Sequence, residues 1–189
     1  SEERYAKGKL SERNIIPFIP NYISIRDYQK NAFEKWKERD FCGIYDMATG
    51  TGKTFTALYS IVELLKIKKQ NLAIIICCPY QHLVNQWAED LEAFGFKYIM
   101  GFSESKQKDW KKRLKKAIFN YSHKISSYFC FITTNATFGT KYIQDSIDSI
   151  TGEILLVVDE AHNFGTSRLV KMLDNRFKYR LALSATLDR

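Results

Sequence analysis

The sequence predicts an α/β domain of three layers with a mainly parallel central sheet, and three observations predict it. Apolar runs at 72–78 and 154–158 contain no polar side chain, as is typical of strands buried on both faces. Segments with apolar residues at helical spacing separate such runs. Strand and helix alternate along nearly the whole chain, which favours parallel strands joined by crossover helices on both faces.

The elements follow from this pattern in order. We expect strands at residues 41–46, 72–78, 97–102, 128–133, 154–158 and 179–183, and helices at 27–39, 53–66, 81–94, 104–119 and 141–150. Asp27 is the expected N-cap of the first helix. Residues 1–24 form an extended lead-in with two prolines, and residues 25–189 form one domain without a repeat, a low-complexity tract or a linker.

Composition narrows the classes of protein. The 189 residues are 45% hydrophobic and 26% charged, which excludes disordered and collagen-like chains. The net charge of +8 suits a polyanionic partner such as nucleic acid. No apolar stretch approaches the ~18 residues that span a bilayer, so we expect no membrane partner. The four cysteines lie in predicted strands without a C-x-x-C pair, which predicts buried free thiols and a reducing cytoplasm; they are Cys42, Cys77, Cys78 and Cys130.

A dense basic segment accounts for much of the positive charge. Within it, Trp110, Leu114 and Ile118 recur at helical spacing, so it predicts an amphipathic helix. Two interpretations stay open: a solvated helix face, or a surface that flanks DNA or docks a partner. The basic residues are Lys106, Lys108, Lys111, Lys112, Arg113, Lys115 and Lys116.

The strongest local motif is Gly50-Thr51-Gly52-Lys53-Thr54, between a predicted strand and a predicted helix. Glycines let backbone N–H groups close around phosphate oxygens, and the helix N-terminus adds a favourable dipole. Lys53 would then reach the β- and γ-phosphates of a nucleoside triphosphate, and the Thr54 hydroxyl would ligate Mg²⁺. The usual P-loop pattern has glycine where this chain has Met47. The alternative is a glycine turn that precedes Lys-Thr by chance.

The second motif is Asp159-Glu160-Ala161-His162, which follows the apolar run at 154–158. Carboxylates at the carboxyl end of a parallel strand face the crevice where ligands bind. We expect Asp159 to hold Mg²⁺ and Glu160 to orient or deprotonate the attacking water. The alternative is that both carboxylates only cap the following segment.

Taken together, these motifs resemble a known family. Met47–Thr54, Asp159–His162 and Ser184-Ala185-Thr186 are similar to motifs I, II and III of superfamily two helicases and translocases of the DEAH-box type. The form Ala-Thr-Gly-Thr-Gly-Lys-Thr is typical there, which explains the missing first glycine and includes Thr49 in the nucleotide-binding loop. Arg26-Asp27-Tyr28-Gln29 resembles the Q-motif, which implies that Gln29 reads the adenine edge with Arg26 nearby.

The resemblance also implies residues for coupling and for nucleic-acid contact. His162, Ser184 and Thr186 correspond to the family's link between nucleotide state and grip on the strand. Segments at two strand ends correspond to motifs Ia and Ib, which contact the nucleic-acid backbone; plain turn chemistry is the alternative. These residues are Pro79, Tyr80, Gln81, Thr133, Thr134 and Asn135. The finer similarity is to restriction-enzyme motor subunits and excision-repair-type DNA translocases.

The family places ATP between two RecA-like domains, and this chain matches the first, a RecA-like P-loop NTPase domain. The second domain, which supplies arginine fingers, is absent from this chain, and the start at Ser1 rather than Met leads us to expect a piece of a longer protein. Arginine fingers contribute roughly 10³–10⁵ in rate in related enzymes, so we expect weak nucleotide binding and negligible ATPase activity from this piece alone.

We therefore expect the ATP-binding motor domain of a DNA helicase or translocase, with ATP and Mg²⁺ as cofactors. An RNA helicase is the nearest alternative, because the ATP motifs do not separate DNA from RNA. A nucleotide-dependent DNA-binding switch without unwinding is a different class. An unrelated P-loop enzyme such as a nucleotide kinase is the weakest alternative.

Overall fold

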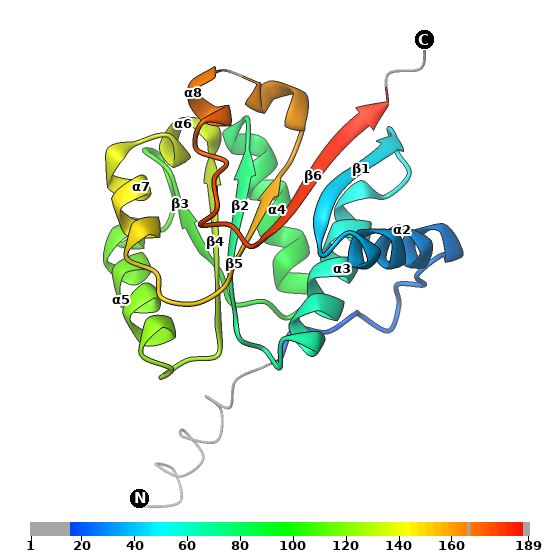
Figure 1. Ribbon diagram of the computed structural model, residues 1–189, viewed down its shortest axis with the longest axis horizontal. Helices are drawn as coiled ribbons and strands as arrows, with labels where there is room; N and C mark the ends of the chain where they lie inside the picture. The colour runs from blue at the N-terminus through cyan, green and yellow to red at the C-terminus, as the bar shows by residue number, and fades with distance from the viewer. Residues whose placement is uncertain (1–15, 166, 187–189) are drawn as a thin grey trace, which may run out of the picture.

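A computed structural model of the chain describes residues 16–165 and 167–186 and contains one sheet of six parallel strands in the order β1-β6-β5-β2-β4-β3 (Figure 1). The strands are β1 (Cys42–Ala48), β2 (Leu72–Cys78), β3 (Ile99–Gly101), β4 (Tyr128–Thr134), β5 (Ile154–Val158) and β6 (Tyr179–Thr186). The helices are α2 (Asp27–Glu38), α3 (Lys53–Ile67), α4 (Gln81–Ala93), α5 (Trp110–Ser122), α6 (Asn135–Phe138), α7 (Lys141–Asp148), the 3₁₀ helix η1 (Ala161–Phe164) and α8 (Ser167–Val170). The predicted three-layer α/β fold is confirmed.

Helices cover both faces of the sheet, as Figure 1 shows. On one face, side chains of α2, α3 and α4 pack on Ile74, Ile76 and the alternate residues of neighbouring strands. On the other face, α5, α6 and α7 pack on Ile75 and the residues of opposite parity. All seven residues of β2 and all five of β5 are buried, because both faces of these central strands are covered.

Most predicted elements are confirmed, with boundary shifts of one to three residues, but the basic helix begins six residues later than predicted. Residues 104–109 form a loop because two side chains bond back to β3: Ser105 donates to the carbonyl of Met100 at 2.5 Å, and Gln107 accepts from its N–H at 2.9 Å. Lys106 and Lys108 therefore lie on this loop and not on α5. The sequence pattern did not predict α6, η1 and α8, each of which has four residues.

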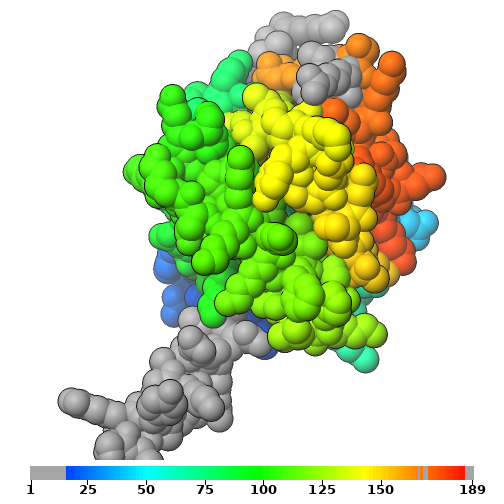
Figure 2. All heavy atoms as spheres, turned by 90° about the vertical axis from the view of Figure 1, so that its left-hand side faces the viewer, coloured from blue at the N-terminus to red at the C-terminus, as the bar shows by residue number. Residues whose placement is uncertain are grey.

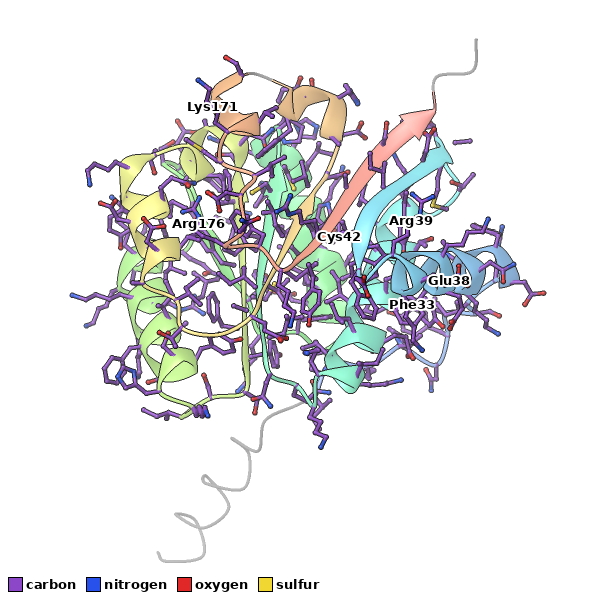
Figure 3. The ribbon with its side chains drawn as sticks, in the orientation of Figure 1. Phe33, Glu38, Arg39, Cys42, Lys171 and Arg176 are labelled. Atoms are coloured by element: carbon purple, nitrogen blue, oxygen red, sulfur yellow. The ribbon has the colours of Figure 1, made fainter. Side chains whose placement is uncertain are left out.

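Two smaller predictions are wrong. Arg26, not Asp27, is the N-cap of α2, and its N–H is bonded by the Gln29 side chain at 2.9 Å. Cys42 is exposed, while the other three cysteines are buried free thiols as predicted. Cys42 lies on β1, the edge strand, on the side that no described helix covers (Figure 3). No helix in the described ranges is long and apolar enough to cross a membrane.

Candidate nucleotide-binding site

The candidate site lies at the carboxyl edge of the sheet. β1 leads into the glycine loop and α3, and β5 leads into Asp159 and Glu160. β6 lies between these two strands and pairs with both. The topology thus brings together motifs that are more than 100 residues apart, at the edge where ligands bind in parallel sheets.

The glycine loop has the backbone conformation that its sequence predicts. Gly50 and Gly52 have φ angles of 80° and 78°, in the left-handed region that side chains with a Cβ disfavour. The loop is held by Thr51, whose hydroxyl donates to the carbonyl of Ala48 at 2.6 Å. Tyr28 on α2 donates to the carbonyl of Thr51. The sequence analysis did not identify Tyr28 as a support of this loop, although it lies within the Q-motif-like segment.

Lys53, Glu160 and His162 lie close together beside the loop. Lys53 Nζ lies 3.4 Å from Glu160 Oε1, and His162 Nδ1 lies 3.6 Å from Glu160 Oε2. Glu160 has a φ of 47°, which is uncommon for a residue other than glycine directly after a strand. A left-handed residue of this kind costs about 1–3 kcal/mol and often marks a functional site.

Asp159 is buried, with 7% of its surface exposed, and both of its carboxylate oxygens have partners. Oδ2 accepts from the indole Nε1 of Trp87 on α4 at 2.9 Å, and Oδ1 accepts from the N–H of Glu160 at 2.8 Å. Burial raises the pKa of Asp159, and the bond from Trp87 opposes that rise. The sequence analysis did not identify Trp87, because only the fold brings it to Asp159.

Gln29 connects the Q-motif-like segment to α3 by a side-chain hydrogen bond. Its amide nitrogen donates to the Thr56 hydroxyl at 3.0 Å, and that hydroxyl donates to the carbonyl of Gly52 at 3.0 Å. Its amide oxygen accepts from the N–H of Arg26. One amide hydrogen and one lone pair of Gln29 are left by these bonds. That is the capacity which the predicted contact with adenine requires.

The oxygen donors here fit Mg²⁺. Thr54 follows Lys53 in the first turn of α3, and the Asp159 carboxylate lies at the end of β5. Mg²⁺ prefers hard oxygen ligands and is usually held by one or two carboxylates together with substrate phosphates. Within residues 16–165 and 167–186, no three His, Cys, Asp or Glu side chains form a metal cluster, and a Mg²⁺-nucleotide site of this kind needs none.

The predicted coupling residues lie on β6 and after β5. Ser184 is half-buried and pairs with Asp46 of β1, and the backbone of Thr186 pairs with Ala48; the Thr186 side chain lies outside the described part. The structure thus places Ser184 and Thr186 directly beside the strand that enters the glycine loop.

The two predicted nucleic-acid segments differ. Tyr80 and Gln81 are exposed at the carboxyl end of β2, with Pro79 half-buried, and the Tyr80 ring stacks on His82 with centroids 5.6 Å apart. Thr133, Thr134 and Asn135, by contrast, are all buried.

The buried threonines of this segment make hydrogen bonds around the end of β4. The Thr133 hydroxyl donates to the carbonyl of Gly101 at 2.6 Å, and the Thr134 hydroxyl accepts from the N–H of Thr137 and caps α6. The Thr133 and Thr134 side chains thus make bonds within the protein, as the alternative interpretation expects, whereas Asn135 Oδ1 is buried without a hydrogen-bond partner among the described residues. A backbone contact from this segment therefore remains a prediction that depends on main-chain groups.

The fold and this site define a class: a P-loop nucleotide-binding domain of the RecA-like type. Comparison with known proteins then gives the family. The family described as "Type III restriction enzyme, res subunit" (ResIII) matches residues 22–189, so the chain belongs to it. A DNA 3'-5' translocase, XPB2 of Sulfurisphaera tokodaii, is 37% identical over 89 residues, which are 44% of this chain and 18% of XPB2.

Solved structures share the fold. The Type ISP restriction-modification enzyme LlaGI, solved with a DNA substrate mimic, has a TM-score of 0.67 at 22% identity, over 87% of this chain and 18% of that one. The Sulfolobus solfataricus SWI2/SNF2 ATPase core, solved with double-stranded DNA, has 0.62 at 21% identity, over 93% and 34%. The UvsW helicase of bacteriophage T4 has 0.62 at 18% identity, over 99% and 61%. The chain thus spans less than a fifth of XPB2 and of LlaGI.

Proposed function

We propose that this chain is the ATP-binding motor domain of a DNA helicase or translocase, which couples ATP hydrolysis to movement on DNA. The observation that carries the proposal is the approach of Lys53 to Glu160 at 3.4 Å, beside a loop in which Gly50 and Gly52 have left-handed φ angles. Family membership supports it. XPB2 is a DNA translocase, and LlaGI and the SWI2/SNF2 ATPase core were both solved with DNA, which favours DNA over RNA for this chain.

In this proposal the loop residues bind the triphosphate. The N–H groups of the loop and of the α3 N-terminus face the phosphates, and Lys53 leaves Glu160 for the β- and γ-phosphates. Arg26 and Gln29 hold the adenine. The residues that line the nucleotide are Thr49, Gly50, Thr51, Gly52, Lys53 and Thr54.

Glu160 acts on water. Once Lys53 turns to the phosphates, the Glu160 carboxylate is released to orient a water molecule and to accept its proton. Thr54 and Asp159 would hold Mg²⁺, which supplies a positive charge to the phosphate oxygens when bound. His162, 3.6 Å from Glu160, together with Ser184 and Thr186, links this carboxylate to the state of the bound strand.

Two parts of the proposal concern partners. A second RecA-like domain of the same polypeptide completes the ATP site, which the greater length of XPB2 and LlaGI supports. Nucleic acid lies along the carboxyl edge of the sheet at Pro79, Tyr80 and Gln81, where loops present main-chain and polar groups to phosphates.

The three buried free thiols support a reducing, cytoplasmic location.

The test is ATP hydrolysis by the natural full-length polypeptide with duplex DNA, single-stranded DNA and RNA. DNA should stimulate turnover most, and Glu160→Gln should lower turnover at least about 100-fold while ATP still binds. The 189-residue chain alone should bind nucleotide weakly and hydrolyse almost none.

Other outcomes would identify the alternatives. Greater stimulation by RNA would favour an RNA helicase. DNA binding that responds to ATP without movement along DNA would favour a switch. Robust DNA-stimulated turnover by the 189 residues alone would show that no second domain is needed.

A further inference from the structure

Helix α4 contacts the candidate nucleotide site through one buried side chain. Trp87 is 1% exposed, and its indole N–H donates to Asp159 Oδ2 at 2.9 Å. This bond joins residues 72 positions apart in the sequence. Because Asp159 Oδ1 is held by the N–H of Glu160, Trp87 fixes the second oxygen and with it the rotation of the carboxylate.

The same helix begins at the surface proposed for nucleic acid. Tyr80 is its N-cap, is 54% exposed, and stacks on His82 in the first turn. Trp87 follows seven residues after Tyr80, which is about 10 Å along a helix that rises ~1.5 Å per residue. Helix α4 therefore begins at an exposed aromatic residue, Tyr80, and carries a buried indole, Trp87, that is bonded to the Asp159 carboxylate.

We propose that Trp87 is a positioning residue that sets the orientation of Asp159 and couples it to nucleic acid bound at the start of α4. The inference rests on the proposed function, since it assigns a link between that function's two sites. A small movement of α4 would change the Trp87–Asp159 bond, because such bonds weaken steeply with distance and angle. Asp159 would then present its lone pairs to Mg²⁺ in a different direction.

The chain contains a matched control. Trp36 on α2 is 2% exposed, and its indole N–H donates to the carbonyl of Arg180 at 2.9 Å. Trp36→Phe and Trp87→Phe each remove one buried indole donor at the same bond length. Only the second touches a carboxylate of the candidate site.

The first experiment is NMR of the chain with ¹⁵N-labelled indoles, which gives one signal for each of its three tryptophans. The Trp→Phe variants assign the signals. Mg²⁺-ADP and a short single-stranded DNA are added separately, and fluorescence anisotropy first gives the concentration at which each saturates the chain. Each ligand should shift the Trp87 indole signal and leave the Trp36 signal unchanged. Bound DNA that leaves the Trp87 signal unmoved would overturn the coupling. If the 189-residue chain binds no DNA, the full-length polypeptide takes its place, and a full-length polypeptide that binds no DNA would overturn the proposed DNA function and, with it, the coupling.

The second experiment measures ADP binding against Mg²⁺ concentration. Trp87→Phe should raise the Mg²⁺ concentration for half-maximal binding by about 10-fold, in line with other losses of a partner behind a metal ligand, and leave Mg²⁺-free ADP binding unchanged. Trp36→Phe should change neither. An unchanged Mg²⁺ dependence, or an equal loss of Mg²⁺-free binding, would overturn the positioning role. If Trp87→Phe fails to fold, the response of the wild-type Trp87 signal to Mg²⁺ at constant ADP decides the same point.

Discussion

The two edges of the sheet use charged residues in opposite ways. At the amino edge, Glu153 lies 2.7 Å from both Lys68 and Lys178 and accepts from the Tyr179 hydroxyl at 2.8 Å. Burial alone raises the pKa of Glu153, but the bonds from Lys178 and Lys68 outweigh it and lower the pKa to about 2. At the carboxyl edge, burial raises the pKa of Asp159. The amino edge has its charges satisfied within the protein.

The carboxyl edge leaves capacity for a ligand. The pair between Lys53 and Glu160 is longer, at 3.4 Å, and Glu160 has a left-handed backbone. A charged side chain whose bonds are all made within the protein stabilises the fold and binds no further ligand. A lysine with one long contact to a carboxylate, by contrast, can exchange that carboxylate for a phosphate. The difference teaches that pairing, rather than burial, distinguishes the structural carboxylate from the candidate catalytic one.

The basic side chains of the second half of the chain likewise divide into those with partners within the protein and those without. Among the described residues, Lys108, Lys112 and Lys115 have no ion pair and are exposed. They lie on α5 and the loop before it, segments that Figure 2 shows in green beside α7 in yellow. Lys111 differs, because its ammonium lies 5.1 Å from the Tyr142 ring centroid. Arg176, labelled in Figure 3, differs from these lysines because it forms ion pairs with Asp148 at the end of α7 and with Asp174.

The largest expected effect is that of Lys53→Ala. In the full-length polypeptide it should lower ATP turnover at least about 100-fold, because a charge that stabilises the transition state is lost. The loss in the free energy of unfolding should be much smaller than the loss in transition-state stabilisation, since the pair with Glu160 is long, at 3.4 Å, and Glu160 keeps a contact with His162. Lys66→Ala on the same helix is the control, and denaturant titration with an ATPase assay measures both. Turnover close to wild type would contradict the proposed role of the carboxyl edge.

Glu153→Gln should have the reverse effect: lower stability at unchanged turnover. The native pKa lies below the unfolded one, so the stabilisation is present above about pH 4.5 and is lost as pH falls toward 2. At pH 7 the loss should be about 1–2 kcal/mol, less than the full shift implies because Glu153 is 31% exposed.

The measurement is denaturant unfolding between pH 3 and 7, with Glu63→Gln as a control, because Glu63 has an ion pair with a single lysine, Lys66, among the described residues. The wild-type and Glu153→Gln curves should converge as the solution becomes acidic. A difference that stays constant with pH would show that the amino-edge cluster is not what stabilises this end of the sheet.

The smallest expected effect is charge reversal on the α5 face. Lys108→Glu, Lys112→Glu and Lys115→Glu together should lower DNA affinity several-fold and reduce the salt slope of duplex binding by about 0.9 for each phosphate that these lysines neutralise in the wild type. The triple reversal of Lys37, Lys69 and Lys97, exposed elsewhere, changes the net charge equally and is the control. Equal salt slopes for the two triple variants would favour the solvated-face interpretation.

The sequence by itself determined the layers of the fold and the residue types of the candidate site. Uninterrupted apolar runs can be buried only in a covered strand, and the order of glycine, lysine and carboxylate segments is local information. Residues 104–109 show the limit, because their helical pattern is overridden by bonds with Met100 that exist only once β3 is in place.

The tertiary structure alone decided which side chains meet. Thr133 lies near the carboxyl end of β4 and Tyr80 just after that of β2, yet Thr133 is buried, with its hydroxyl bonded to the Gly101 carbonyl of β3, and Tyr80 is exposed. Trp87 reaches Asp159 only because β2 and β5 are neighbours in the sheet. Strand order is a property of long-range packing, and no local pattern in the chain records it.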